Sequence, residues 1–294
     1  MPAHLPRWNI GVGRVLLLVL VGLVGFFLPQ FLPLEGLWSA PLRFLISLAV
    51  LAVAFRLVSR GSGDDLGLGP APLGRCVGWA LAAGLGAQAV TVAVNAAVGG
   101  TPFPGVEANA ELLQQSALLQ TVADEAGEPV PVEPYAPAPV AAVVPIILSI
   151  VVLAPVVEEV VFRGLVFRGV RDLVGMRLPA AASFWIAALA QAALFAGIHP
   201  SDPMSLLVTG GLAILWAAAF ARTGSLTVAM VAHSLFNATT MLIVAVGPNR
   251  PVGFPPAIVA LIVVAPLITW AVAAVLRRTL GTGLRIAAPL PVRA

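Results

Sequence analysis

Eight long apolar runs constrain this chain more than any other feature. A transmembrane helix needs about 20 mostly apolar residues to cross about 30 Å of hydrocarbon. With 60% hydrophobic and 10% charged residues, against about 25% charged in a soluble domain, the chain is predicted to be an all-α, polytopic transmembrane bundle. The spans are expected at about 13–33, 41–58, 76–98, 140–168, 180–199, 204–221, 225–246 and 255–276.

The arginines predict the orientation of these spans. All 16 basic residues are arginines, and with alternating spans fourteen lie on one side of the membrane, leaving only Arg43 and Arg250 on the other. Cytoplasmic loops carry the excess of positive charge. Both termini are therefore predicted to be cytoplasmic, in a multi-pass protein of the cell (plasma) membrane. Because the arginines flank apolar spans, they indicate no nucleic-acid partner.

Two adjacent acids, Glu158 and Glu159, interrupt the fourth run. Carboxylates at membrane depth are costly and usually mark a functional site. Glu159 precedes Arg163 by four residues, the favourable order for an ion pair on a helix. Glu158 points about 100° away around the helix and lacks that partner, which suits a general base. The alternative is a buried charge network that only locks helices together.

Three further polar residues lie in or at the ends of later spans: His199, His233 and Asn237. His233 and Asn237 are four residues apart and share a helix face. A carboxylate and an imidazole can hold a water molecule and remove its proton, while a second imidazole and an amide can stabilise an oxyanion. For these side chains to meet, either their helices bend or tilt around Pro145, Pro155 and Pro200, or they share a water-filled cavity. An interfacial helix over 164–178 would shift the fifth span.

Three motifs occur in order on successive spans: Glu-Glu-x-x-x-Arg at 158–163, Phe-x-x-x-His at 195–199 and His-x-x-x-Asn at 233–237. In this order they resemble the CPBP family, which groups CaaX prenyl endopeptidases with bacterial bacteriocin-processing and immunity-type (Abi-like) membrane proteins. The resemblance covers about 146–240. It implies a glutamate-dependent intramembrane endopeptidase that hydrolyses membrane-associated, prenylated-type or precursor peptides at the bilayer.

The resemblance also implies a role for each motif residue. Glu158 is expected to be the base, assisted by His199. His233 and Asn237 are expected to stabilise the oxyanion, with Glu159 and Arg163 in support.

No cofactor is favoured, and a metal-free mechanism is preferred. The alternative is Zn²⁺ held by Glu158, His199 and His233, since one carboxylate and two imidazoles form a common catalytic zinc shell. Against it, these residues come from three separate helices and include no local pair such as HExxH.

The resemblance suggests three parts of the chain. Residues 1–139 would be N-terminal membrane helices with an acidic, Pro-rich external connection at about 99–139, in which 106–122 is either a short surface helix or a plain linker. Residues 140–276 would be the catalytic helical core, and 277–294 a basic cytoplasmic tail.

Two other function classes stay open. In a proton-coupled transporter, the acids and histidines would relay protons, although no inverted repeat is visible in the sequence. A non-catalytic immunity or scaffold protein would need no chemistry from Glu158.

Overall fold

A computed structural model describes residues 8, 10–59, 62–69, 73–97, 140–199, 203–246 and 254–281, and every regular element within them is helical. The longer helices are α1 (Val12–Phe27), α2 (Ser39–Ser59), α3 (Leu73–Ala97), α8 (Ala180–Gly197), α9 (Pro203–Thr223), α10 (Leu226–Val246) and α11 (Pro256–Leu280). The 3-10 turn η1 (Leu28–Phe31) extends α1.

The remaining elements form one continuous helix, called here the central helix. In order they are α5 (Val140–Ile147), the π-helical stretch η2 (Leu148–Leu153), α6 (Ala154–Glu158), the π-helical stretch η3 (Glu159–Phe167) and α7 (Arg168–Val174).

The eight predicted spans are confirmed, since within the described residues eight helices are long and apolar enough to cross a membrane. Seven agree closely with the predicted bounds. The fourth is longer, because Val143–Val174 is a single apolar helix of 32 residues with no separate interfacial helix over 164–178. Arg163 and Arg168 are buried inside it, so they do not belong among the loop arginines that predict orientation.

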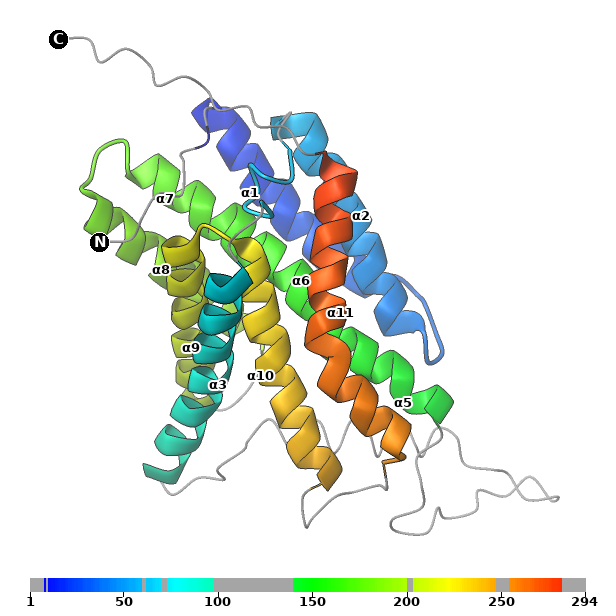
Figure 1. The fold of residues 1–294 in the computed structure, drawn as a ribbon. Helices are drawn as coiled ribbons and strands as arrows, with labels where there is room; N and C mark the ends of the chain where they lie inside the picture. Colours follow the sequence, from blue (N-terminus) through cyan, green and yellow to red (C-terminus); the bar gives the residue numbers. More distant parts are fainter. Residues whose placement is uncertain are drawn as a thin grey trace.

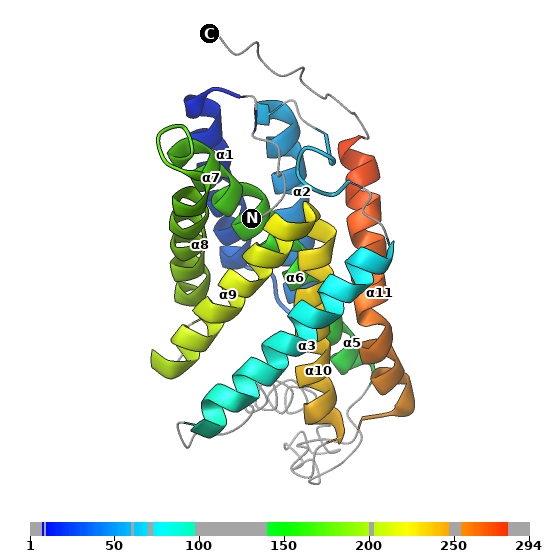
Figure 2. The same ribbon diagram turned by 60° about the vertical axis from the view of Figure 1, so that its left-hand side comes forward.

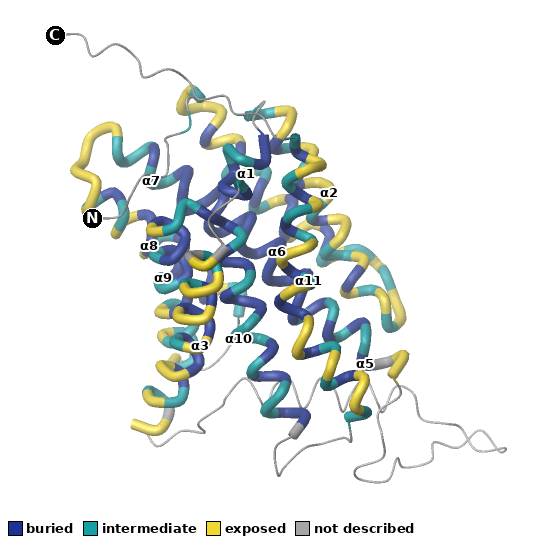
Figure 3. The backbone as a smooth tube through the Cα atoms, viewed as in Figure 1, coloured by how far each residue is buried: buried dark blue, intermediate teal, exposed yellow. Residues whose placement is uncertain are grey.

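The central helix crosses the bundle obliquely and packs against α1, α2, α8, α9, α10 and α11 (Figures 1 and 2). Every residue from 151 to 169 is buried, and Figure 3 shows this part as a continuous dark blue tube. A helix that is apolar on all sides is expected to be enclosed by others. The two π-helical stretches depart from the α-helical period on either side of α6, and such departures are frequent at functional sites.

Short contacts tie both ends of the described chain to one end of the bundle. The segment 62–69 bonds to the last turn of α11 through Gly63 N and Gly281 O (3.0 Å) and to the start of α10 through Leu226 N and Gly67 O (2.7 Å). Trp8, just before α1, donates its indole N–H to the Asp65 carbonyl. The start of α1 and the end of α11 therefore lie at the same end, as alternating spans require. Which end is cytoplasmic stays a prediction from the arginines.

Several expectations lie outside the described residues. They are the acidic connection at 99–139, the bend at Pro200 and the tail beyond Gly281.

Candidate active site

Glu159 and Arg163 form the predicted ion pair inside the central helix. Glu159 Oε1 lies 3.0 Å from Arg163 Nη1, and both side chains are fully buried. Arg163 Nη2 also donates to the Ala213 carbonyl of α9 (3.3 Å). A buried ion pair needs such additional hydrogen bonds to offset its desolvation. The pair therefore fixes the helix segment that carries both acids.

His233 of α10 lies between the two glutamates. Its Nδ1 is 3.0 Å from Glu159 Oε1, and its Nε2 is 3.9 Å from Glu158 Oε2. A carboxylate that is already paired with an arginine can only accept, so Nδ1 is assigned as the donor. This contact turns Nε2 towards Glu158.

Glu158 differs from its neighbour in its surroundings. It is 7% exposed, and among the described residues it forms no ion pair with an arginine, whereas Glu159 pairs with Arg163; its Oε2, like Glu159 Oε2, has no hydrogen-bond partner there. A buried polar atom without a partner is uncommon in native structures and calls for an explanation. The sequence expectation that Glu158 lacks the partner available to Glu159 agrees with this geometry.

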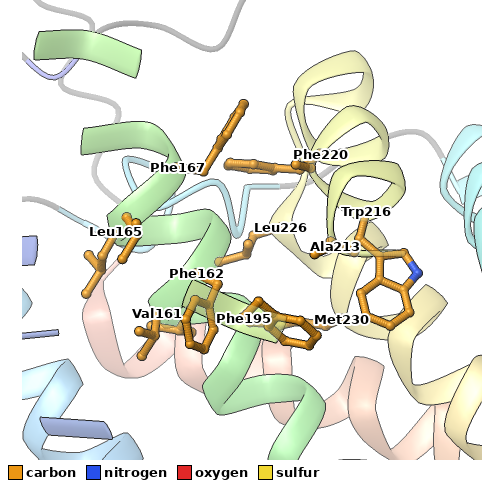
Figure 4. Close-up of a cluster of buried hydrophobic side chains, with 14 of the residues drawn as sticks. Val161, Phe162, Leu165, Phe167, Phe195, Ala213, Trp216, Phe220, Leu226 and Met230 are labelled. Atoms are coloured by element: carbon orange, nitrogen blue, oxygen red, sulfur yellow. The ribbon is translucent and has the colours of Figure 1, made fainter. Parts of the chain in front are cut away.

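Aromatic rings enclose the histidine and the arginine. Trp216 of α9 stacks on His233 with ring centroids 4.1 Å apart and planes at 18°. The Arg163 guanidinium lies over the Phe195 ring of α8, 4.5 Å from its centroid. Figure 4 shows Phe195 and Trp216 within the same apolar cluster, with Phe162 and Met230 beside them. This cluster excludes water from the ion pair and restricts the imidazole plane.

His199 lies two residues beyond the end of α8 and is half-buried. Its Nδ1 is 2.8 Å from the Phe195 carbonyl, which can only accept, so Nδ1 is again the donor and Nε2 an acceptor in the neutral ring. Burial lowers the pKa of His199; the bond to the Phe195 carbonyl opposes this shift, and the nearby Arg163 charge adds to it. The Phe195 ring contacts His199 (4.6 Å between centroids) and His233 (5.9 Å).

Asn237 faces another part of the central helix. Its Nδ2 donates to the Ile150 carbonyl of η2 at 2.8 Å. The structure thus gathers Glu158, Glu159, Arg163 and His233 directly, brings His199 to the same cluster through Phe195, and engages Asn237 with the backbone before Pro155.

Comparison with known protein families points to the same part of the chain as the motifs. Residues 140–239 match the family described as type II CAAX prenyl endopeptidase Rce1-like. Over this segment, about a third of the chain, the protein is similar to that family. No curated protein and no solved structure matches the chain. The Rce1-like segment begins at α5 and ends within α10, so it includes all six residues singled out from the sequence.

Two residues of the Rce1-like segment contact the site but were not predicted from the sequence. Trp216 stacks on His233, and Gln191 of α8 donates to the Ala213 carbonyl (3.0 Å), the same oxygen that Arg163 contacts. Gln191 is a polar residue within an apolar span, and that signal alone singles it out. Trp216 has no comparable signal, because an aromatic residue is ordinary in a membrane helix.

The alternative zinc set is Glu158, His199 and His233 of the Rce1-like segment. Among the described residues, no group of three or more His, Cys, Asp or Glu side chains is arranged to hold a metal ion. The side chains as placed do not fit a three-residue metal shell, and the mechanism proposed for this chain uses none.

Proposed function

We propose that this chain is an intramembrane endopeptidase of the CAAX type in which Glu158 activates water. The observation that supports it most is the buried Glu158 Oε2, without a hydrogen-bond partner among the described residues and 3.9 Å from His233 Nε2. The Rce1-like family and the multi-span fold support the same class of enzyme. The same proposal places the chain in the plasma membrane as a multi-pass protein, and the arginine distribution supports cytoplasmic termini there.

In this mechanism Glu158 takes a proton from water while the water oxygen attacks the peptide carbonyl carbon. His199, an acceptor through Nε2, helps to hold that water. Glu158 then returns the proton to the departing amine nitrogen as the C–N bond breaks. The second water proton stays with the products, which are a carboxylic acid and an amine, or a carboxylate and an ammonium ion after proton transfer between them. No covalent enzyme intermediate is needed.

His233 is suited to stabilise the oxyanion. When protonated it donates from both nitrogens, from Nδ1 to Glu159 and from Nε2 towards the oxygen that becomes negative beside Glu158. Preorganised donors of this kind contribute several kcal/mol to acyl-transfer reactions, roughly 3–4 kcal/mol for one donor. Glu159 and Arg163 hold the imidazole in place.

The test is cleavage of peptides by the purified full-length protein in detergent, followed by mass spectrometry. The panel contains a farnesylated peptide with a C-terminal CaaX sequence, its unprenylated form and unrelated membrane-associated peptides. Cleavage is expected for wild type and lost in Glu158→Ala and His199→Ala. Glu35→Gln, which alters an exposed acid, is the matched control and keeps activity.

Two outcomes contradict parts of the proposal. Loss of cleavage on adding a chelator, restored by Zn²⁺, would overturn the metal-free mechanism. If no peptide is cleaved but proteoliposomes show proton flux that depends on Glu158, the chain is a transporter instead.

A further inference from the structure

Pro155 leaves the central helix short of a backbone donor three residues before Glu158. Proline has no N–H. In an α-helix, the missing donor would pair with the carbonyl of Val151, four residues earlier, and in a π-helix with the carbonyl of Ile150, five residues earlier. Both carbonyls belong to η2, and Val151 is fully buried. A buried carbonyl without a donor destabilises the folded protein.

Side chains from two other helices supply donors to these same two carbonyls. Ser234 Oγ of α10 donates to Val151 O at 2.6 Å, and Asn237 Nδ2 of α10 donates to Ile150 O at 2.8 Å. The Thr269 hydroxyl of α11 lies 3.0 Å from Ser234 Oγ and 3.4 Å from Val151 O.

These contacts also set the position of α10 along the central helix. His233 meets Glu158 and Glu159, Ser234 meets Val151, and Asn237 meets Ile150, so residues later on α10 meet residues earlier on the central helix. A shift of α10 by one residue would lose the carbonyl contacts and the imidazole contacts together.

We propose that Ser234, Asn237 and Thr269 are positioning residues, which replace the backbone donor missing at Pro155 and hold Glu158 opposite His233. The role rests on the proposed function. It gives Asn237 a task beside the oxyanion donor implied by the motif, because one amide hydrogen acts on the enzyme's own backbone and the second stays available to substrate.

The experiment restores the missing donor. Pro155→Ala supplies one N–H that can be shared between the Val151 and Ile150 carbonyls, as Glu159 N is shared between the Pro155 and Val156 carbonyls. In the wild-type background, Ser234→Ala and Asn237→Ala are expected to lower kcat about tenfold or more with little change in KM. In the Pro155→Ala background, the loss for Ser234→Ala is expected to shrink to within about threefold, and the loss for Asn237→Ala is expected to shrink without vanishing.

Controls separate this effect from a general one. Pro145→Ala removes another buried proline of the central helix and is expected to give no rescue. Thr239→Val removes a hydroxyl whose bond among the described residues stays within α10, to Leu235 O, and is expected to leave kcat unchanged. Equal losses for Asn237→Ala in both Pro155 backgrounds would overturn the positioning role and make the amide a group that contacts substrate. An equal loss of kcat for Ser234→Ala in the wild-type and Pro155→Ala backgrounds would overturn the proposal as a whole.

Two readouts keep the test decisive. Thermal unfolding in detergent is expected to show the same coupling between Pro155 and Ser234, so positioning is tested even if wild type cleaves no peptide and the proposed function fails. If Pro155→Ala does not fold, Ser234→Thr decides. It keeps the hydroxyl and should hold kcat within about threefold of wild type, whereas a loss equal to that of Ser234→Ala would contradict the proposal.

Discussion

At the scale of single residues, the two adjacent glutamates have separate tasks. Glu159 Oε1 is shared by Arg163 and His233, each at 3.0 Å, and is fully buried. Glu158 forms no ion pair with an arginine among the described residues, and its contact with His233 Nε2 is longer, at 3.9 Å. We therefore assign Glu159 to the structure of the site and propose that Glu158 carries the chemistry.

Exchange of each acid for its amide separates these tasks. Glu159→Gln leaves the buried Arg163 without its ion-pair partner, and breaking such a pair costs about 3–5 kcal/mol. It is expected to lower the unfolding temperature in detergent markedly. Glu158→Gln removes the base and is expected to abolish peptide cleavage while the unfolding temperature changes little. Similar unfolding temperatures for the two variants would contradict this division.

The lowered pKa of His199 gives a prediction that does not depend on catalysis. Burial lowers the pKa of His199 in the folded protein, whereas in the unfolded chain it takes up a proton near pH 6.5. Between these two values the unfolded state binds more protons, so stability falls as the pH is lowered through that window. His199→Gln cannot take part in this titration.

When the pH is lowered from 7.5 to 5.5, the unfolding temperature of wild type should therefore fall relative to that of His199→Gln. Thermal unfolding of both proteins in the same detergent and buffers measures it. A difference that stays constant with pH, or moves in favour of wild type, would exclude a lowered pKa for His199.

At the scale of helices, the close approach of α3 and α10 depends on one glycine. A Cβ atom at Gly84 would lie 2.8 Å from the Ala232 carbonyl oxygen and 3.1 Å from Leu235 Cβ. Backbone atoms cannot move aside as a flexible side chain does, so Gly84→Ala must displace α10. Ala232 is next to His233, and the displacement reaches the site.

Gly86 on the same helix is the matched control, because a Cβ atom there meets nothing within 4 Å. Gly86→Ala is expected to be neutral or to stabilise α3 by up to about 1 kcal/mol. Gly84→Ala is expected to lower the unfolding temperature and reduce kcat about tenfold or more, since a misplacement of about 1 Å can cost a hundredfold. Equal behaviour of the two variants would show that the helix contact is not tight.

The sequence was sufficient for the spans and for the Glu159–Arg163 pair, because both follow from local spacing. Apolar length alone specifies a membrane helix, and four residues specify a turn. It was not sufficient for the interior of the fourth span. Pro155 is visible in the sequence and predicts a bend. The side chains that donate to the η2 carbonyls preceding Pro155 come from α10 and α11, about 80 to 120 residues away. The stacking of Trp216 on His233 is likewise set by tertiary packing.

At the scale of the whole molecule, the segment 62–69 joins helices that are distant in sequence. Gly63 and Gly67 bond to the ends of α11 and α10, and Asp64 pairs with Arg277 of α11 (2.7 Å). That ion pair is partly exposed, and such pairs are worth about 0–1 kcal/mol. The strength of this connection therefore rests on its backbone and its packing.

Gly67 is the critical position of that segment. Its φ of +91° disfavours any residue with a side chain, and a Cβ atom there would lie 2.8 Å from the Phe220 ring of α9. Gly36 has a similar φ of +85° but nothing within 4 Å of a Cβ atom. Gly36→Ala therefore measures the cost of the backbone conformation alone, while Gly67→Ala adds the clash. The fall in unfolding temperature should be clearly larger for Gly67→Ala, because α9 and α10 must separate from the segment. Equal falls would mean that the Phe220 ring simply turns away, and that this end of the bundle is held by helix packing rather than by the segment.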